Sequence, residues 1–420
     1  MTDGSDTRAK ASDADHYWLM EGFTDGGERV PLDERHMQGL DPSLKGIKIV
    51  DCDTHFSEPP DLFRNAPAKY KDRMPVMRTV DGFDKWFIGD RSFGLTGGNV
   101  IGNDRSKLYG RLAYPRLELG DPGSYRVKER LERMDEMGVH AHICFQNGGV
   151  TQAGSLMALG DDELALVIIQ TFNDACAARQ EESGNRLFSL PQLPMWDRAA
   201  TMAEARRCID LGLKGFVLPD KPERIGKPSW SNSYWDELWE MCEATGTPLN
   251  FHLNSSLNPQ ALTWDEFEFE QRLAVVGMMM SIANASNLGN WMVSGILDRY
   301  PKLKIGLIES GMGWIPFVVE MLEHQFDEMM PNFKKTLQKR PTEYFRDNFW
   351  CTFWYESIAP SKMLDLVGED KVLFETDYPH PTSLYPDVQE HIVKVLGHHD
   401  YAIKKKILET NAVKLYNLPF

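Results

Sequence analysis

The sequence predicts a parallel (β/α)8 barrel, or TIM barrel, that makes up most of the chain. From residue 46 onward, eight short apolar segments alternate with amphipathic helical segments. This alternation is typical of parallel α/β proteins. Ionisable side chains directly follow several of the apolar segments, which is where barrel enzymes carry their active sites. A long doubly wound sheet would show the same alternation, but the placement of the polar residues favours the barrel.

The chain begins with a segment that precedes the first expected strand. Residues 1–45 show no sustained hydrophobic period and are rich in Gly, Asp and charged residues. They predict an N-terminal arm that is mobile or lies on another surface. The first strand is expected at residues 46–53, where the apolar run GIKIV is followed by the mostly polar DCD. The barrel is therefore expected to comprise residues 46–420.

The segment after the first strand is too long for an ordinary βα loop. Residues 58–125 contain many Gly and Pro and short mixed segments such as KWFI at 85–88. Such a composition indicates turns and short strands rather than one long helix. We interpret the segment as an insertion that caps the barrel.

The rest of the chain alternates regularly between helix and strand. Charged amphipathic segments predict helices at 126–137, 161–182, 199–211 and 234–244. Apolar runs predict further strands at 141–145, 187–193, 215–218, 248–252, 304–308, 348–353 and 371–374. If the eight strands close into a barrel, their carboxyl ends meet at one opening.

Composition and charge exclude several classes of partner. The formal net charge of −16 gives a surface that repels nucleic acid phosphates and anionic lipids. The first residues lack the apolar region of a signal peptide, and no later run reaches membrane-spanning length. The six cysteines include no C-x-x-C pair, so we expect reduced, structural thiols. We therefore expect a cytoplasmic protein that binds neither nucleic acid nor membrane.

Four ionisable residues lie where predicted strands end. Asp53 and His55 lie at and just past the end of the first strand, His252 ends the fifth, and Asp377 follows the eighth. An Asp-x-His pair taken alone is more often a cap or a hydrogen-bonded pair than a metal site. The coincidence of all four with strand ends favours a metal site, since core histidines have no reason to follow that register. Imidazole and carboxylate donors together suit Zn²⁺, Fe²⁺ or Mn²⁺.

Several ordered motifs resemble a known family. The segments are VDCDTHFSEP at 50–59, NFH at 250–252, IESGMGWIP at 308–316, LFETDYPHP at 373–381 and ILETNAVKLY at 407–416. In this order they resemble the amidohydrolase superfamily, in particular its amidohydrolase 2 branch. That branch includes nonoxidative decarboxylases and hydrolases that act on small carboxylated rings. The likeness extends over about residues 46–420 and is far more specific than any single motif.

The resemblance implies a ligand set and shows two departures from it. His55, His252 and Asp377 fall on the family's metal positions, whereas Asp53 stands where many members carry the first His of a His-x-His pair. Glu309 stands where the decarboxylases and hydrolases carry a catalytic histidine. Carboxylates harden the ligand set, so zinc remains the first choice but Mn²⁺ or Fe²⁺ gain weight, and a second metal is possible.

Three residues are candidates for catalysis, namely Asp377, Glu309 and His380. Glu309 has three interpretations: a metal ligand, a general base, or a structural acceptor for backbone N–H groups at the following helix. His380 either reaches the pocket or a second metal, or is a solvated rim histidine. The polar end of the seventh strand, Trp354-Tyr355-Glu356, is expected to face the same opening and could contact substrate.

The leading hypothesis is hydrolysis or nonoxidative decarboxylation of a small organic acid or amide. In the first case Asp377 takes a proton from metal-bound water; in the second it manages the proton that replaces carbon dioxide. One alternative is a dinuclear Fe or Mn oxygenase, with Asp53, Glu309 and His380 as additional ligands. Another is a non-catalytic subunit that supports an active partner. We expect a small-molecule substrate and a homo- or hetero-oligomer.

Overall fold

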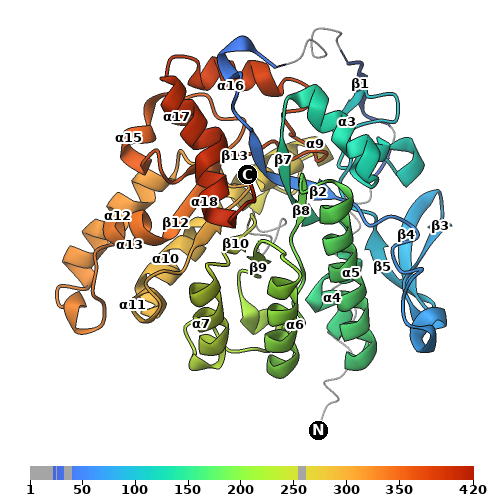
Figure 1. Ribbon diagram of the computed structural model, residues 1–420, viewed down its shortest axis with the longest axis horizontal. Helices are drawn as coiled ribbons and strands as arrows, with labels where there is room; N and C mark the ends of the chain where they lie inside the picture. The colour runs from blue at the N-terminus through green and yellow to red at the C-terminus, as the bar shows by residue number, and fades with distance from the viewer. Residues whose placement is uncertain (1–21, 25, 33–39, 254–261) are drawn as a thin grey trace.

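Eight parallel strands form the centre of the molecule (Figure 1). The computed structural model describes residues 22–24, 26–32, 40–253 and 262–420. The strands are β2 (Val50–Phe56), β7 (Ala141–Gln146), β8 (Leu187–Ser189), β9 (Phe216–Val217), β10 (Leu249–Phe251), β11 (Ile305–Leu307), β12 (Phe349–Phe353) and β13 (Val372–Phe374). Their order in the sheet is β8-β7-β2-β13-β12-β11-β10-β9.

This order confirms the predicted barrel fold. Consecutive strands are neighbours, and the first strand, β2, pairs in parallel with the last, β13. The hydrogen-bonded sheet ends at β8 and β9, so its ladder does not complete the expected closure. Pro191 and Pro219 follow these two short strands closely, and proline has no N–H to donate. For the same reason β8 ends at Ser189 rather than at residue 193.

The first strand also differs from its expected bounds. It begins at Val50 and extends to Phe56, so Asp53 and His55 lie inside it. Its polar end stays in the sheet because Thr54 and His55 align with Cys144 and Phe145 of β7. The register with β7 shifts between Asp51 and Thr54, and such irregularities often re-aim side chains beside active sites.

Helices cover the outside of the sheet. The predicted helices agree with α3 (Val127–Met137), α5 (Asp162–Glu182), α6 (Arg198–Asp210) and α7 (Asp236–Thr245) to within one or two residues at each end. In Figure 1 the green helices α5 to α7 and the orange to red helices α12 to α18 flank the strands. The other helices that follow strands are α4 (Ala153–Met157), α9 (Phe269–Ala283), α10 (Ala285–Val293), α11 (Ile296–Arg299), α12 (Ile315–Met329), α13 (Pro341–Asn348), α14 (Ala359–Lys362), α15 (Leu364–Val367), α16 (Val388–Leu396), α17 (Tyr401–Lys405) and α18 (Asn411–Tyr416).

The core lies inside the sheet and between the sheet and its helices. The last helix, α18, places the buried Leu415 and Tyr416 against Val50, Ile143 and other strand residues. The Tyr416 hydroxyl donates a hydrogen bond to Oδ1 of Asn250 over 2.8 Å, which satisfies both buried polar groups.

The segment from 58 to 125 forms its own small sheet. Strands β3 (Val76–Val80), β4 (Phe83–Ile88) and β5 (Arg91–Leu95) pair as an antiparallel meander. A fourth strand, β6 (Lys107–Tyr109), pairs with β1 (Glu28–Val30) from the N-terminal arm. Strand β1 of the arm therefore lies on the insertion, whereas the arm near Asp41 contacts Gln389 of α16. Residues 1–21, 25 and 33–39 of the arm fall outside the described residues.

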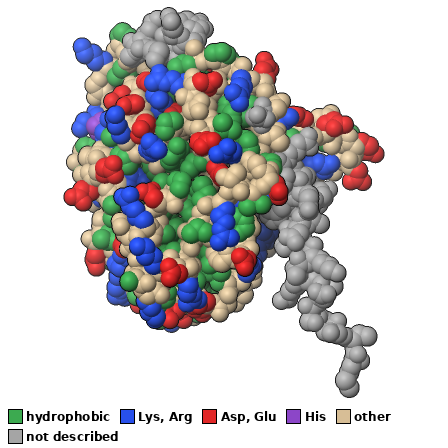
Figure 2. All heavy atoms as spheres, turned by 90° about the vertical axis from the view of Figure 1, so that its right-hand side faces the viewer, with side chains coloured by type: hydrophobic (Ala, Val, Ile, Leu, Met, Phe, Trp, Pro, Cys, Tyr) green, Lys and Arg blue, Asp and Glu red, His purple; other side chains and the backbone are tan. Residues whose placement is uncertain are grey.

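The surface carries mixed charge. Figure 2 shows one face on which hydrophobic side chains gather near the middle and Lys, Arg, Asp and Glu surround them. Within the described ranges, none of the helices is both long and apolar enough to cross a membrane.

Candidate metal centre

Five ionisable side chains meet at the carboxyl ends of the strands. Asp53 and His55 come from β2, His252 directly follows β10, Glu309 lies two residues past β11, and Asp377 lies three residues past β13. Asp53 and His55 alternate with Thr54 in the strand and therefore face the same side. The structure thus brings together all five residues that were expected to hold a metal.

The distances between four of these side chains fit one small ion, and Asp377 lies beside them next to His55. Nε2 of His55 lies 3.6 Å from Oδ1 of Asp53 and 3.3 Å from Oδ1 of Asp377. Nε2 of His252 lies 3.4 Å from Oδ2 of Asp53 and 3.0 Å from Oε2 of Glu309. One ligand atom each of Asp53, His55, His252 and Glu309 can be chosen so that all lie within 4.8 Å of one another.

The facing atoms have no hydrogen-bond partner among the described residues. They are both carboxylate oxygens of Asp53, Nε2 of His55 and of His252, Oε2 of Glu309 and Oδ1 of Asp377. The side chain of His252 is 21% exposed, and the other four are at most 7% exposed. Burying several unpaired charged groups is costly unless they coordinate a cation. The donor set therefore fits a divalent metal ion.

One hydrogen bond determines which nitrogen of His55 faces the centre. Nδ1 of His55 lies 3.0 Å from the carbonyl oxygen of Gln146. A carbonyl oxygen only accepts, so Nδ1 carries the proton and Nε2 carries the lone pair. A backbone carbonyl on the second nitrogen is the usual arrangement for a metal-binding histidine.

His380 belongs to the centre and is not a solvated rim residue. Its ring stacks on that of His55 with centroids 3.6 Å apart, and its Nδ1 lies 3.1 Å from Oδ1 of Asp377. Its Nε2 lies 2.8 Å from Oδ1 of Asn147, which also accepts the N–H of Gly98. Because this oxygen only accepts, Nε2 of His380 is the donor and Nδ1 faces Asp377. His55, Asp377 and His380 form a second group of closely spaced donors.

The structural interpretation of Glu309 fails because Glu356 takes that role. The carboxylate of Glu356 accepts the backbone N–H of Met312 at 3.0 Å and that of Gly313 at 2.8 Å, just before α12. An anion at a helix N-terminus is stabilised there. Glu356 is therefore engaged with the backbone at the start of this helix.

Backbone conformation marks two of these residues. Glu309 has φ of 53° and Asp377 has φ of 60°, which lie in the left-handed region that side chains other than glycine rarely adopt. Such strain costs roughly 1–3 kcal/mol and collects at functional sites. The fold therefore holds both carboxylates in place at a cost in stability.

The pKa shifts describe a crowded anionic centre. Burial raises the pKa of Asp377 well above its usual value, and the carboxylates of Glu309 and Asp53 raise it further. Burial also raises the pKa of Glu309, while it lowers the pKa of His55 to about 4. Burial lowers the pKa of His252, but Glu309 and Asp53 outweigh it and the net shift is upward. A bound cation would stabilise the ionised carboxylates.

Sequence reasoning missed the residues that support the centre. Oε2 of Glu375 accepts the backbone N–H of Glu309 over 3.0 Å, and Asp51 accepts the N–H of Thr376 over 2.9 Å. Arg130 of α3 donates to the carbonyl oxygen of His55. The sequence hinted at these supporting residues only through polar residues beside apolar runs. These are DCD at 51–53 and ETD at 375–377.

Comparison with known proteins finds a matching family model and similar relatives. Residues 50–418 match the family model described as amidohydrolase. Gamma-resorcylate decarboxylase from Polaromonas sp. is 26% identical over 266 residues, which cover 60% of this chain and 76% of the relative.

Solved structures share the fold. An amidohydrolase from Mycobacterium avium subsp. paratuberculosis K-10 has a TM-score of 0.67 at 21% identity, over 88% of this chain and 99% of its own. A dihydroxybenzoic acid decarboxylase from Polaromonas sp., with bound manganese and the inhibitor 2-nitroresorcinol, has a TM-score of 0.58 at 20% identity, over 89% and 98% of the two chains.

Proposed function

This chain belongs to the amidohydrolase family, and from that premise we propose that it is a manganese-dependent nonoxidative decarboxylase of a small hydroxylated aromatic acid. It is a metal-dependent enzyme of the hydrolase or nonoxidative decarboxylase type. Decarboxylation is favoured over hydrolysis because the Polaromonas relative described above is a decarboxylase. The proposed substrate class, a hydroxylated aromatic acid, follows from the name of that relative.

The observation that carries the proposal is the set of buried donor atoms that have no hydrogen-bond partner among the residues the structure describes. Asp53, His55, His252, Glu309 and Asp377 are the proposed ligands. Asp53, His55, His252 and Glu309 form one group of closely spaced donors, and Asp377 joins it through His55. The set is rich in carboxylate oxygen, which suits manganese better than zinc. Manganese is also present in the related decarboxylase structure. Both points support manganese, whereas the sequence alone favoured zinc.

The residues around the centre suit proton delivery to a ring carbon. When bound, the cation supplies positive charge to the carboxylate and adjacent hydroxyl oxygens of the substrate. The pair formed by Asp377 and His380, 3.1 Å apart, holds the proton. As carbon dioxide leaves, the electron pair of the broken C–C bond stays on the ring carbon, which takes this proton. Solvent water then returns a proton to the pair.

Glu309 departs from the family's histidine and has a different role in this proposal. An anion cannot polarise the substrate as an imidazolium does. Its Oε2 instead lies 3.0 Å from Nε2 of His252, among the other donor atoms. Glu309 therefore acts as a metal ligand and compensates for the smaller number of imidazoles.

A dinuclear oxygenase is the second candidate, because a second donor group of His55, Asp377 and His380 shares His55 with the first. It requires two metal ions per chain, whereas the decarboxylase requires one. The supporting-subunit alternative is disfavoured, since a non-catalytic barrel gains nothing from buried, unpaired donors.

The test is a product analysis of the manganese-loaded protein. We expect 2,6-dihydroxybenzoate to give resorcinol and carbon dioxide in equal amounts, with one manganese per chain by elemental analysis. In D₂O, one deuterium should enter the ring carbon between the two hydroxyl groups. Failure to release carbon dioxide from any hydroxybenzoate, or oxygen consumption with two metals per chain, would overturn the proposal.

We also propose that the enzyme is an oligomer. Large hydrophobic side chains are strongly exposed, including Trp264 at 75%, Phe317 at 64% and Ile358 at 74%. Contiguous exposed apolar surface marks protein contacts, although single exposed residues are ordinary. Light scattering on the purified protein tests this, and a mass of 47.9 kDa, that of one chain, would refute it.

A further inference from the structure

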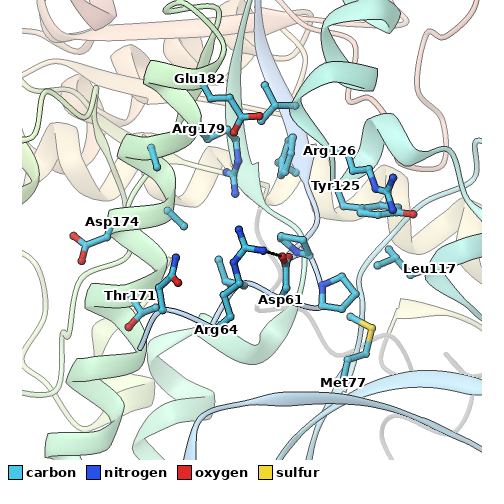
Figure 3. Close-up of a pocket in the computed structure, with 18 of the residues that line it drawn as sticks. Asp61, Arg64, Met77, Leu117, Tyr125, Arg126, Thr171, Asp174, Arg179 and Glu182 are labelled. Carbon is cyan, nitrogen blue, oxygen red and sulfur yellow. Dashed lines mark hydrogen bonds and ion pairs between the residues drawn. The ribbon is translucent and has the colours of Figure 1, made fainter. Parts of the chain in front are cut away.

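A large groove lies apart from the metal centre. It has a volume of about 1140 Å³ and opens between the insertion, α3 and α5 (Figure 3). None of the proposed metal ligands lines it. Apolar side chains form much of its wall, among them Phe56, Pro59, Leu62, Met77 and Tyr125. A groove of this size and lining admits a small organic molecule.

Arg179 of α5 supplies a buried positive charge to the groove. Its side chain is only 6% exposed, and in Figure 3 it points from the helix toward the middle of the groove. One guanidinium nitrogen donates to Oγ of Ser189, and the Cys176 thiol provides a further weak contact. The guanidinium carbon lies 3.9 Å from the ring centroid of Phe56. Most of its five N–H groups therefore remain available.

Arg179 forms no direct ion pair with a carboxylate within the described part of the chain, although its charge acts on the buried Glu58 and opposes the rise in pKa that burial causes there. The acidic residues that line the groove are engaged elsewhere, with the exception of Glu182, which is exposed and forms no ion pair with Arg179. Their partners are Arg64 for Asp61, Arg116 for Glu118, Arg126 for Glu129, Arg207 for Asp174, and the backbone N–H of Leu117 for Asp84. A buried guanidinium without an anion in direct contact is only partly compensated, so an external carboxylate would be stabilised here.

We propose that this groove is a second binding site, for a small organic acid with an apolar body. The carboxylate would bind the guanidinium of Arg179, a pairing that allows two parallel hydrogen bonds. The apolar body would pack against Phe56, Met77 and Tyr125. Such a site goes beyond the proposed decarboxylation and does not depend on it.

The two sites lie on opposite faces of the same strand. Phe56 directly follows His55 in β2, and successive side chains of a strand point to opposite faces. His55 therefore faces the metal centre while Phe56 lines the groove. Since they share no side chain, variants can remove either site separately.

Calorimetric titration of the manganese-loaded enzyme with benzoate tests the proposal. Arg179→Met keeps a similar volume without the charge, and it should weaken groove binding at least about tenfold. Ala178→Phe fills the groove from an exposed position of α5 and keeps Arg179, so it should also remove binding even if the first variant folds poorly. Ala199→Phe, at an exposed position of α6 outside the groove, is the matched control and should bind normally.

A metal-site variant separates the two proposals. Groove binding of benzoate should persist in His252→Ala, in which the metal centre is impaired. A crystal soaked with benzoate should place its carboxylate on Arg179. The proposal is overturned if benzoate does not bind, if its binding is lost in His252→Ala, or if Arg179→Met and Ala178→Phe both bind it as the wild type does.

Discussion

Oε2 of Glu309 lies 3.0 Å from Nε2 of His252, and neither atom has a hydrogen-bond partner among the residues described. Glu309 reaches this position with a left-handed backbone conformation. Its backbone N–H donates a hydrogen bond to Oε2 of Glu375, which holds that conformation. A residue that only capped the next helix would need neither feature. This geometry supports the proposal that the two residues are ligands of one cation.

Glu309→Gln should therefore impair metal binding. The change keeps the volume but removes a charge, so we expect manganese affinity to fall at least about tenfold and activity to fall with it. Metal titration and initial rates at saturating manganese measure the two effects. Glu320→Gln, at an exposed position of α12, is the matched control. A fully metallated and fully active Glu309→Gln enzyme would show that this residue is not a ligand.

Replacement of Glu356 should lower stability and leave metal binding unchanged, the opposite of the effect expected for Glu309. The carboxylate of Glu356 binds two N–H groups at the start of α12, so Glu356→Ala should lower the free energy of unfolding by about 1–2 kcal/mol. Manganese content should not change, because Glu356 is not among the donor atoms of the centre. Denaturant unfolding and elemental analysis distinguish the two carboxylates. Loss of metal with unchanged stability would reverse the assignments of Glu309 and Glu356.

His252→Ala should remove metal and activity while the barrel stays folded. The residue lies at the opening of the barrel, outside its packed layers, and its side chain is 21% exposed. We expect an unchanged far-ultraviolet circular dichroism spectrum together with a loss of bound manganese. Retention of stoichiometric metal in this variant would exclude His252 as a ligand.

The fold and the donor set could be predicted because both leave local traces in the sequence. Apolar runs mark the strands, and polar residues such as His252 and Asp377 mark their carboxyl ends. The roles of Glu309 and Glu356 could not be separated in this way. Both are single glutamates after a strand, and only the three-dimensional structure shows which one meets the helix N-terminus.

Other features depend on long-range contacts that leave no local pattern. Asn147 lies in a loop after β7, and its position between Gly98 and His380 arises only when the insertion packs against the loop after β13. Arg130 looks like any charged residue of an amphipathic helix until its contact with the His55 carbonyl is known. The gap between β8 and β9 depends on prolines that fix the ends of two very short strands.

Asn147 should act through His380. Asn147→Leu removes the acceptor that orients the imidazole, so we expect kcat to fall roughly tenfold to hundredfold with little change in KM or manganese content. Asn147→Asp retains a carboxyl oxygen as acceptor and should recover part of the rate. Ser57→Ala removes the other side-chain partner of Asn147, at 2.8 Å, and should have a small effect. A loss of metal in Asn147→Leu would indicate a structural role instead.

Glu58 is a buried carboxyl group outside the donor set. Its Oε2 accepts the N–H of Gly148 over 2.9 Å, whereas Oε1 has no partner among the described residues. Burial raises the pKa of Glu58 to about 7 from an ordinary value of 4.5. Between these two values the folded protein holds a proton that the unfolded chain releases. The protonated Glu58 therefore makes its full contribution to the free energy of unfolding below about pH 4.5. This contribution is lost as the pH rises through about 7.

Glu58→Gln should remove this pH dependence, because glutamine stays neutral and can still accept the Gly148 N–H. Relative to the wild type, the free energy of unfolding of Glu58→Gln should rise by up to about 3 kcal/mol between pH 4.5 and pH 7.5, since each pH unit between the folded and unfolded pKa values contributes about 1.4 kcal/mol. Urea unfolding of both proteins at saturating manganese measures the difference. Glu163→Gln, an exposed control whose pKa is lowered instead, should show no such gain. If the two curves for wild type and Glu58→Gln stay parallel over this range, Glu58 is ionised in the folded protein and its burial is compensated by a partner.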